Sequence, residues 1–394
     1  MNYSINENFR FISTEQSSYS CNILAIGDPH FKTDNINESK KFIKELDYFI
    51  DHYEFKINYI VVLGDILHTH EKLHTHALNI AVDFFTLLTD KVKQNIIDHI
   101  YILIGNHDAT NNTIFLNQNH WMNILKKWDY LTIVDYPLII DNQFILCPYV
   151  PDGKFIDALK LVFEDKWKTK KLIFAHQTFN NAKMGAIVAK GVDEWEEHFP
   201  LCISGHIHDK QKIKNNLFYT GSSMQHGFGD NDDKSLALIK IIDYIIIVED
   251  LFLNLPKKKI IYTDIENIEK SIEKIQQNKN ENISYKIVIK DNEEEYKSFK
   301  QTSKFKEIEK INEVKSIAFK KDYKSIIEKE NLLINNSKNI NTSENELLNN
   351  LGESDDFINL LVNIVLEEND PYLQKLCESI LTESTTTDED IIII

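Results

Sequence analysis

Arginine is almost absent from the chain, because Arg10 is the only arginine among 394 residues. Bidentate contacts from arginine commonly read guanine in duplex DNA. Lysine supplies the remaining positive charge, and lysine acts as a point charge rather than as a planar fork. Sequence-specific readout of duplex DNA is therefore not expected.

Cysteine is scarce and widely scattered, at positions 21, 147, 202 and 377. This spacing fits neither a disulfide framework nor a zinc site of the Cys-x-x-Cys kind. We therefore expect buried free thiols, which indicate a reducing compartment, the cytoplasm or the nucleus.

Long apolar runs are also missing, since no stretch approaches the roughly 20 residues that span a bilayer. The first 18 residues lack the basic start, the apolar centre and the small-residue cleavage site of a secretory signal. We expect an intracellular protein that neither crosses a membrane nor is secreted. Hydrophobic residues make up 42% of the chain and charged residues 27%, which excludes wholesale disorder.

Charge is distributed unevenly along the chain. Residues 1–250 carry 24 basic and 33 acidic side chains, residues 251–340 carry 19 and 15, and residues 341–394 carry 1 and 13, which gives the net charge of −17. An acidic protein does not attract nucleic acid by its overall charge. A polyanionic substrate would need a local basic surface or bound metal ions.

Short β-rich runs alternate with amphipathic stretches between Cys21 and Asp250. Runs such as 21–27 and 57–64 predict strands, and residues 38–55 and 74–98 show apolar side chains at helical spacing. This alternation predicts an α/β domain, in which the loops at the strand ends meet in one crevice. The polar residues that follow predicted strand ends are Asp28, His30, Asp65, Asn106, His107, His176, His206 and His208.

The pattern changes after Asp250, where the segment 253–259 predicts a hinge. A small α/β module follows, with predicted helices at 263–279 and 292–312 and predicted strands at 285–289 and 314–319. A polar linker and two short helices come after it. We therefore expect three parts: an α/β domain over 18–250, a small basic module over 251–330, and a linker, two helices and an acidic tail over 331–394.

Five short motifs place these polar residues in order. Carboxylate, imidazole and amide groups without a thiolate suit a pair of divalent cations such as Mn²⁺, Fe²⁺, Zn²⁺ or Mg²⁺. Two such ions lie roughly 3.5–4 Å apart, so one ligand has to bridge them, and Asp65 is the natural candidate. The motifs are Asp28-Pro29-His30, Gly64-Asp65-Ile66-Leu67-His68, Gly105-Asn106-His107-Asp108, Ala175-His176 and Gly205-His206-Ile207-His208.

The ordered motifs over residues 28–208 resemble those of the calcineurin-like metallophosphoesterases. Two details resemble the DNA double-strand-break nuclease branch, of which bacterial SbcD is a member. They are His68 at the end of the second motif, and Gln211 followed by Gly221-Ser222 after the last motif. The basic module after Asp250 occupies the place of that branch's DNA-capping domain. One departure is Ser223, where the family usually has proline.

The resemblance implies a two-layer αββα sandwich with a small C-terminal α/β cap and terminal helices. It also implies a phosphodiesterase that uses two divalent metal ions, Mn²⁺ first among them, to hydrolyse DNA as an exonuclease or endonuclease subunit in repair or recombination. Contact with DNA would be made without sequence-specific readout.

The resemblance further assigns a role to each motif residue. Asp28, His30 and His208 would bind one metal ion, Asn106, His176 and His206 would bind the other, and Asp65 would bind both. His107 would act on the leaving group and Asp108 would orient it. His68 would lie near the scissile phosphate.

Two further histidines and the substrate class stay open. His70 belongs to a histidine-rich run that opens a predicted helix, so it would lie on a solvated helix face or contact substrate. His226 would either contact substrate or be structural. A phosphomonoesterase or a small-molecule phosphodiesterase of the same superfamily is the alternative, and a closed pocket would favour it. A non-catalytic scaffold is disfavoured because every expected ligand is present.

The predicted helices at 356–366 and 371–381 present apolar faces beyond a polar linker. Helices this short need a surface to pack on. In the nuclease branch that the chain resembles, the C-terminal part docks on a coiled-coil ATPase subunit. We therefore expect residues 350–382 to bind an SbcC-like ATPase subunit or a second copy of this chain, with folding back onto the phosphoesterase domain as the alternative.

Overall fold

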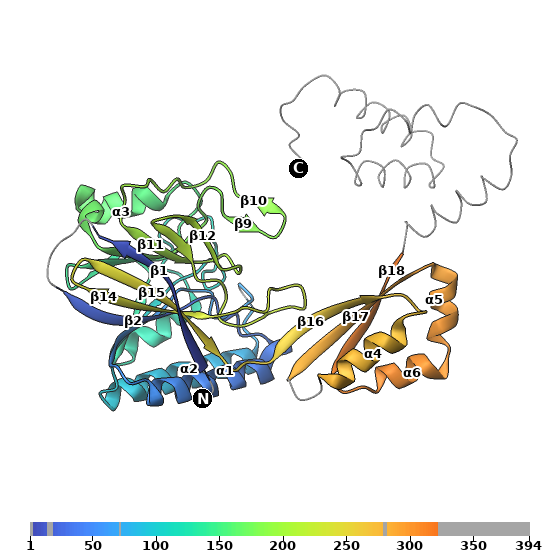
Figure 1. The fold of residues 1–394 in the computed structure, drawn as a ribbon. Helices are drawn as coiled ribbons and strands as arrows, with labels where there is room; N and C mark the ends of the chain where they lie inside the picture. Colours follow the sequence, from blue (N-terminus) through green and yellow to red (C-terminus); the bar gives the residue numbers. More distant parts are fainter. Residues whose placement is uncertain (1–2, 14–18, 71, 279–281, 322–394) are drawn as a thin grey trace, which may run out of the picture. The chain divides into compact units, whose positions relative to one another are not determined.

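A computed structural model describes residues 3–13, 19–70, 72–278 and 282–321 of the protein (Figure 1). The chain divides into two compact units. The first holds residues 1–261 together with 269–287 and 307–317, and the second includes residues 262–268 and 288–306. The predicted helices at 356–366 and 371–381 lie outside the described residues, so their docking on a partner stays a prediction.

A seven-stranded sheet forms one layer of the large α/β domain, in the order β1-β15-β14-β2-β3-β4-β5. Strands β2 to β5 are parallel, while β14, β15 and β1 extend the sheet by antiparallel pairing. The strands are β1 (Tyr3–Ile12), β2 (Ser20–Ile26), β3 (Ile57–Val62), β4 (Ile97–Leu103), β5 (Leu131–Val134), β14 (Leu236–Ile242) and β15 (Ile245–Leu253).

A six-stranded sheet forms the facing layer, in the order β12-β13-β11-β8-β7-β6. Its four central strands are parallel, and its two edge strands are antiparallel to their neighbours. The strands are β6 (Leu138–Ile140), β7 (Phe144–Cys147), β8 (Leu172–His176), β11 (Leu201–Gly205), β12 (Gln211–Lys214) and β13 (Leu217–Tyr219). A separate two-stranded hairpin consists of β9 (Lys183–Met184) and β10 (Ile187–Val188).

Alternate side chains of each strand supply two different cores, because successive side chains of a strand point to opposite faces. Leu24 and Ile60 pack with residues of α1 (Ile36–His52) and α2 (Thr75–Lys93), while Ile23 packs between the two sheets. The outer face of the second sheet packs on α3 (Phe155–Phe163) and a 3₁₀ helix at Glu164–Thr169. The layers are therefore helix, sheet, sheet and helix, which confirms the predicted αββα sandwich.

The module after this domain contains the three-stranded sheet β16-β17-β18. Its elements are β16 (Lys257–Thr263), α4 (Ile268–Gln277), β17 (Ile283–Asp291), α5 (Glu293–Lys300), α6 (Ser303–Glu309) and β18 (Val314–Lys321). The single helix predicted over 292–312 is wrong. The Thr302 hydroxyl ends one helix by donating to the Phe299 carbonyl (2.7 Å) and begins the next by accepting from the Phe305 amide (3.2 Å).

The structure also differs from the sequence-based boundaries at three places. Strand β1 belongs to the first sheet although it precedes the expected domain start at residue 18. The expected hinge over 253–259 contains the start of β16. The apolar run 138–149, whose composition predicts a single strand, is a hairpin of β6 and β7. Strand β1 depends on pairing with the distant strand β15, which local periodicity does not encode. The break in 138–149 is instead a local turn at Asp141 and Asn142, which both have positive φ.

The expectations about free cysteines and about membrane-spanning helices can be compared with the described part of the chain. Cys21, Cys147 and Cys202 are buried free thiols, as predicted, and Cys377 lies outside that part. Among the described residues, none of the helices combines the length and the apolar character needed to cross a membrane.

Phe9 provides a test of the unpredicted strand β1, because it is 9% exposed and packs edge-on against Phe218 with the ring centres 5.2 Å apart. We expect Phe9→Ala to lower the free energy of unfolding by about 3 kcal/mol through lost burial and a cavity. Ile12→Ala on the same strand is the matched control, because Ile12 is 69% exposed. Urea denaturation measures both, and equal small losses would mean that β1 contributes little.

Candidate metal centre

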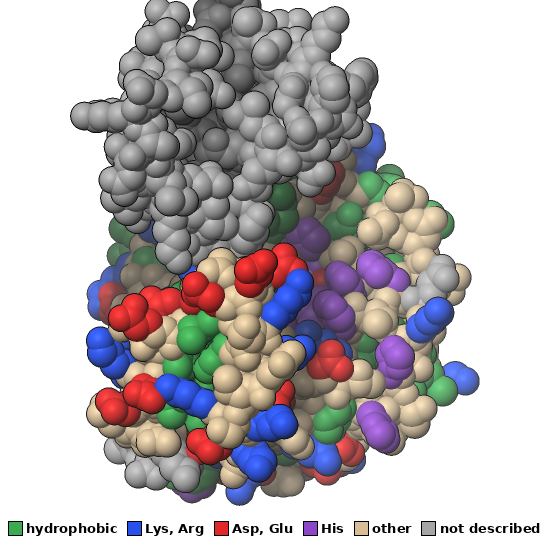
Figure 2. All heavy atoms as spheres, turned by 90° about the vertical axis from the view of Figure 1, so that its right-hand side faces the viewer, with side chains coloured by type: hydrophobic (Ala, Val, Ile, Leu, Met, Phe, Trp, Pro, Cys, Tyr) green, Lys and Arg blue, Asp and Glu red, His purple; other side chains and the backbone are tan. Residues whose placement is uncertain are grey.

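The predicted ligands lie together at the carboxyl ends of the parallel strands of both sheets. Asp28 and His30 follow β2, Asp65 follows β3, and Asn106 follows β4. His176 ends β8, and His206 and His208 follow β11. Because the two sheets face each other, loops from both bring their side chains to one place. Figure 2 shows histidine side chains gathered in one region of the surface.

Several of the predicted ligands have left-handed backbone conformations, which residues other than glycine rarely adopt. Asp28, Asp65 and His206 have φ values of 36°, 50° and 80°. Such left-handed conformations in non-glycine residues cluster at functional sites, where the surrounding structure holds them. The third motif begins with glycine because a Cβ atom at Gly105 would lie 2.2 Å from Asp65 Oδ1. Only glycine lets the two loops approach this closely.

The first group of ligands consists of Asp28, His30, Asp65 and His208. One ligand atom from each of the first three lies within 4.8 Å of the others. His30 Nε2 lies 3.4 Å from Asp65 Oδ2 and 3.0 Å from His208 Nε2. Asp28 accepts a hydrogen bond from the His206 amide through Oδ1 (2.9 Å), which leaves Oδ2 buried and without a donor among the described residues.

The second group consists of Asp65, Asn106, His176 and His206. Asn106 Oδ1 lies 2.9 Å from His176 Nε2 and 2.8 Å from His206 Nδ1. His176 Nε2 lies 3.3 Å from Asp65 Oδ2. The other ring nitrogen of His176 lies 2.7 Å from the Leu63 carbonyl, so Nδ1–H donates to that carbonyl and Nε2 points toward the group. Asp65 belongs to both groups, as a bridging ligand would.

These side chains fit a pair of divalent cations. Ring nitrogens face each other and face oxygens that carry no proton, and Asp28 Oδ2 lacks a donor within the described residues. The set contains imidazole, carboxylate and amide groups, which suit borderline and hard cations. Asp28, His30 and His176 are also buried, so water does not solvate the carboxylates and ring nitrogens there.

Burial also sets the charge state of the ligands. Burial, reinforced by the neighbouring His176, lowers the pKa of His206 to about 3, so its ring is neutral and has a lone pair to offer. Burial raises the pKa of the Asp28 carboxyl. Burial also acts to raise the pKa of Asp65, but His176 and His30 outweigh it and hold that pKa well below its usual range. Bound cations would stabilise both carboxylates in their charged form.

Comparison with known proteins agrees with this geometry. Residues 21–210 match the calcineurin-like phosphoesterase family. The protein 244L of Invertebrate iridescent virus 6, named as a phosphoesterase, is 42% identical over 290 residues, which cover 72% of this chain and 98% of 244L. The chain belongs to the calcineurin-like phosphoesterase family. The protein 078R of Invertebrate iridescent virus 3, also named as a phosphoesterase, is 32% identical over 367 residues, which cover 92% of this chain and 96% of 078R.

The protein is therefore a metallophosphoesterase, a hydrolase of a family that uses divalent metal ions. His107 lies beside the ligands of this phosphoesterase. Its amide donates to Asp65 Oδ1 (2.8 Å), and its Nδ1 lies 2.6 Å from the His68 carbonyl. The carbonyl can only accept, so Nδ1 carries the proton and Nε2 is left to accept or to relay one.

Two further histidines, His68 and His70, lie against His107. The His68 ring stacks on it with the ring centres 5.6 Å apart, and His68 Nδ1 lies 3.3 Å from His30 Nδ1. The His70 ring stacks on His107 at 4.3 Å. His70 precedes α2 rather than opening it, because α2 begins at Thr75. The structure therefore places both histidines beside the phosphoesterase centre.

The expectation that Asp108 orients His107 requires correction. Asp108 is buried and accepts hydrogen bonds from the amides of Ile66 (3.1 Å) and Gly105 (3.0 Å) and from the Trp121 indole (3.2 Å). Its oxygens therefore tie together the loops that carry the second and third motifs. The His68 carbonyl takes the role of orienting His107.

Of the two roles left open for His226, the structure favours the structural one. His226 is buried, its Nε2 lies 3.0 Å from the Asp28 carbonyl, and its ring centre lies 5.1 Å from that of His30. Asp230 fixes this loop by accepting from the amides of His226 (2.6 Å) and Gly227 (3.1 Å). His226 thus supports the ligand loops from behind.

Two residues near the phosphoesterase centre have no place in the sequence-based prediction. Lys234 donates from Nζ to the His208 carbonyl (2.6 Å), and nothing in its acidic sequence context indicates this. The Tyr149 ring lies 5.8 Å from that of His206. Tyr149 follows β7 directly after Pro148, so its position at a strand end is a signal that could have found it.

Asp65→Asn tests whether one carboxylate serves both ligand groups. We expect the variant to hold fewer than two metal ions per chain and to lose the metal-dependent rise in Tm, because a negative charge shared by both ions is removed. Elemental analysis and thermal denaturation with and without Mn²⁺ measure this. Asp90→Asn is the control, since Asp90 is a surface carboxylate on α2 paired with Lys93 at 2.8 Å. A variant that retained both ions and the full rise would contradict the bridging role.

Proposed function

We propose that this phosphoesterase hydrolyses phosphodiester bonds of DNA, as a nuclease subunit of the SbcD-like kind, with Mn²⁺ as its preferred metal. The observation that carries the proposal is the open edge of the metal centre. His68 and His70 are exposed and His107 is half-buried, so these three imidazoles face solvent beside the buried ligands. A polymer can reach such an edge, whereas a small substrate is usually enclosed.

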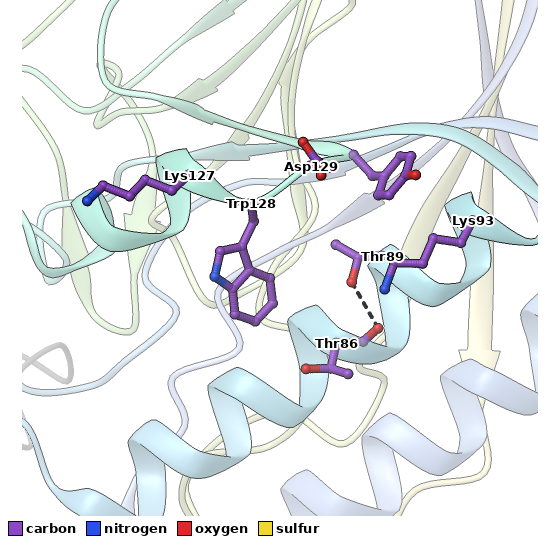
Figure 3. A pocket seen from close by; sticks show the side chains of 7 residues that line it. Thr86, Thr89, Lys93, Lys127, Trp128 and Asp129 are labelled. Carbon is purple, nitrogen blue, oxygen red and sulfur yellow. Dashed lines mark hydrogen bonds between the residues drawn. The ribbon is translucent and has the colours of Figure 1, made fainter.

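Two cavities of the described residues lie away from the metal centre. One cavity of about 350 Å³ lies beside α2 and includes Lys93, Lys127 and Trp128 (Figure 3). Another of about 590 Å³ includes Tyr3, Phe252 and Lys257. Neither is lined by any of the predicted metal ligands, or by His68, His70 or His107. These cavities therefore give no support to a closed small-molecule pocket around the metal centre.

The residues of the centre have separable roles in the proposed reaction. Two divalent cations held here would activate the attacking water and neutralise the phosphoryl oxygens. Asp65 and the other ligands would hold these cations and thereby fix the position of the reacting phosphate. His107, whose Nδ1–H is held by the His68 carbonyl, would in its doubly protonated form donate the Nε2 proton to the leaving oxygen or stabilise its charge. His68 and His70 keep the His107 ring in place by stacking.

The basic segment after residue 250 supports a polyanionic substrate. Residues 251–340 carry 19 basic and 15 acidic side chains within an otherwise acidic chain, and all the basic ones are lysines. Lysines attract phosphates without reading bases. DNA would therefore be bound through its backbone, with little dependence on sequence and strong dependence on salt.

A substrate panel tests the proposal. Protein with Mn²⁺ is given linear duplex DNA, single-stranded DNA and bis(p-nitrophenyl) phosphate. We expect cleavage of DNA and of the small diester, with only the DNA reaction weakened steeply by added salt, because counterion release accompanies binding of a polyanion. Turnover of a phosphomonoester together with inertness toward DNA would favour the alternative of a phosphomonoesterase.

His107→Ala separates chemistry from metal binding. We expect kcat on DNA to fall by roughly 10²–10⁴ with the metal content unchanged, since a positioned general acid contributes about that much. The kcat on a substrate with an activated leaving group, such as p-nitrophenolate, should fall less, because that leaving group needs little protonation. His198→Ala is the control, because His198 is exposed and its only ring contact among the described residues is edge-on, with Phe199. Loss of metal in His107→Ala would make His107 a ligand instead.

A further inference from the structure

The hairpin of β9 and β10 is a small independent sheet. Met184 pairs with Ile187, and Lys183 pairs with Val188. Side chains directly opposite each other share a face, so Met184 and Ile187 form one face of the tip. Gly185 has φ 62°, as the first position of a tight two-residue hairpin turn requires. Figure 1 shows the hairpin as a projection from the large domain.

The tip of the hairpin is apolar and exposed. Ile187 is 65% exposed, Met184 42% and Val188 40%. Ala182 and Ala189, which flank the strands, are buried in the core under the second sheet. The hairpin therefore has an anchored base and an apolar end in solvent. Adjacent exposed apolar side chains of this kind indicate a contact surface.

Hydrogen bonds tie the base of the hairpin to the segment that follows the last metal-ligand motif. Gln211 accepts from the Lys183 amide (2.8 Å) and donates to the Lys183 carbonyl (2.9 Å). Gln211 follows His208 by three residues, and Lys183 follows His176 by seven. The Ala189 amide donates to the Ala182 carbonyl (2.8 Å) and closes the base. The hairpin thus lies in the segment after His176 and is bonded to the segment after His208.

Positive charge flanks the apolar tip. Lys183 and Lys190 are exposed, and neither forms an ion pair with another residue of the described part of the chain. This combination suits a ligand that presents apolar faces and negative charge together. Nucleic acid does so, because its bases stack on apolar surface and its phosphates attract lysine.

We propose that the β9–β10 hairpin contacts the bases of the substrate strand next to the scissile phosphate. Met184 and Ile187 on one face of the hairpin, and Val188 on the other, pack against the bases at the end of a duplex and part the terminal base pair, while Lys183 and Lys190 pair with phosphates. Apolar side chains of these types unstack bases in other nucleic-acid complexes. This inference rests on the proposed DNA substrate, and it adds that substrate strands are separated at the hairpin before cleavage.

A tip variant tests the inference in the full-length protein. It combines Met184→Ser, Ile187→Thr and Val188→Thr, which remove the apolar surface and keep residues compatible with a hairpin. The matched control combines Leu161→Ser and Ile242→Thr, because Leu161 is 61% exposed on α3 and Ile242 is 48% exposed on β14. The substrates are blunt duplex DNA with 2-aminopurine at its last base pair, and bis(p-nitrophenyl) phosphate.

We expect kcat/KM of the tip variant on the duplex to fall about tenfold, the effect of losing one base-stacking contact. Turnover of bis(p-nitrophenyl) phosphate should stay unchanged. The wild type and the control should raise 2-aminopurine fluorescence on binding, and the tip variant should not.

Three results would overturn the inference. If the tip variant cleaves the duplex and raises 2-aminopurine fluorescence normally, the hairpin does not bind DNA. If that variant also loses self-association in size-exclusion chromatography, the hairpin is a contact between protein chains. Equal losses on both substrates would mean that the hairpin only supports the ligand loops. A wild type that hydrolyses the small diester and never DNA would refute the proposed substrate itself.

Discussion

Three carboxylates and several imidazoles are buried together at one edge of two facing sheets, and most of the local structure follows from this arrangement. Taking a carboxylate out of water costs several kcal/mol unless charge or hydrogen bonds compensate it. Asp108 receives three donors from the protein itself. Asp28 receives only one amide at Oδ1 and leaves Oδ2 without a described donor. The difference separates a carboxylate that fixes loops from one that is available to a cation.

The αββα layering makes this burial feasible. Asp65 comes from the first sheet and His176 from the second, and they meet only because the parallel strands of both sheets end at the same edge. Strained φ values at Asp28, Asp65 and His206 aim the side chains inward. The cores on both faces of each sheet hold these loops against that strain.

The residues around the metal centre fall into two groups: those that hold the ligand loops, and those that face solvent. His226, Asp230 and Lys234 hold the ligand loops from behind through backbone groups. His68 and His70 face solvent on the other side, stacked around His107. In the proposed DNA contact, the hairpin tip would add apolar side chains to this side. A substrate that approaches it would meet histidine, lysine and apolar surface, and no arginine, because Arg10 lies on β1 and pairs with Glu7.

The sequence by itself determined the α/β class, the family and the residues that gather at the strand ends, because strand periodicity and glycine-flanked motifs are local properties. It did not reveal β1 or the division of residues 292–312 into two helices, since these depend on a distant partner strand and on a single capping hydroxyl. It also could not decide which atom each side chain would meet. Only the tertiary structure placed the His68 carbonyl, rather than Asp108, against the His107 ring, and turned His226 inward. Hydrogen-bond partners of this kind lie up to 198 residues apart along the chain, so the packing of the layers, not the spacing of the motifs, decides them.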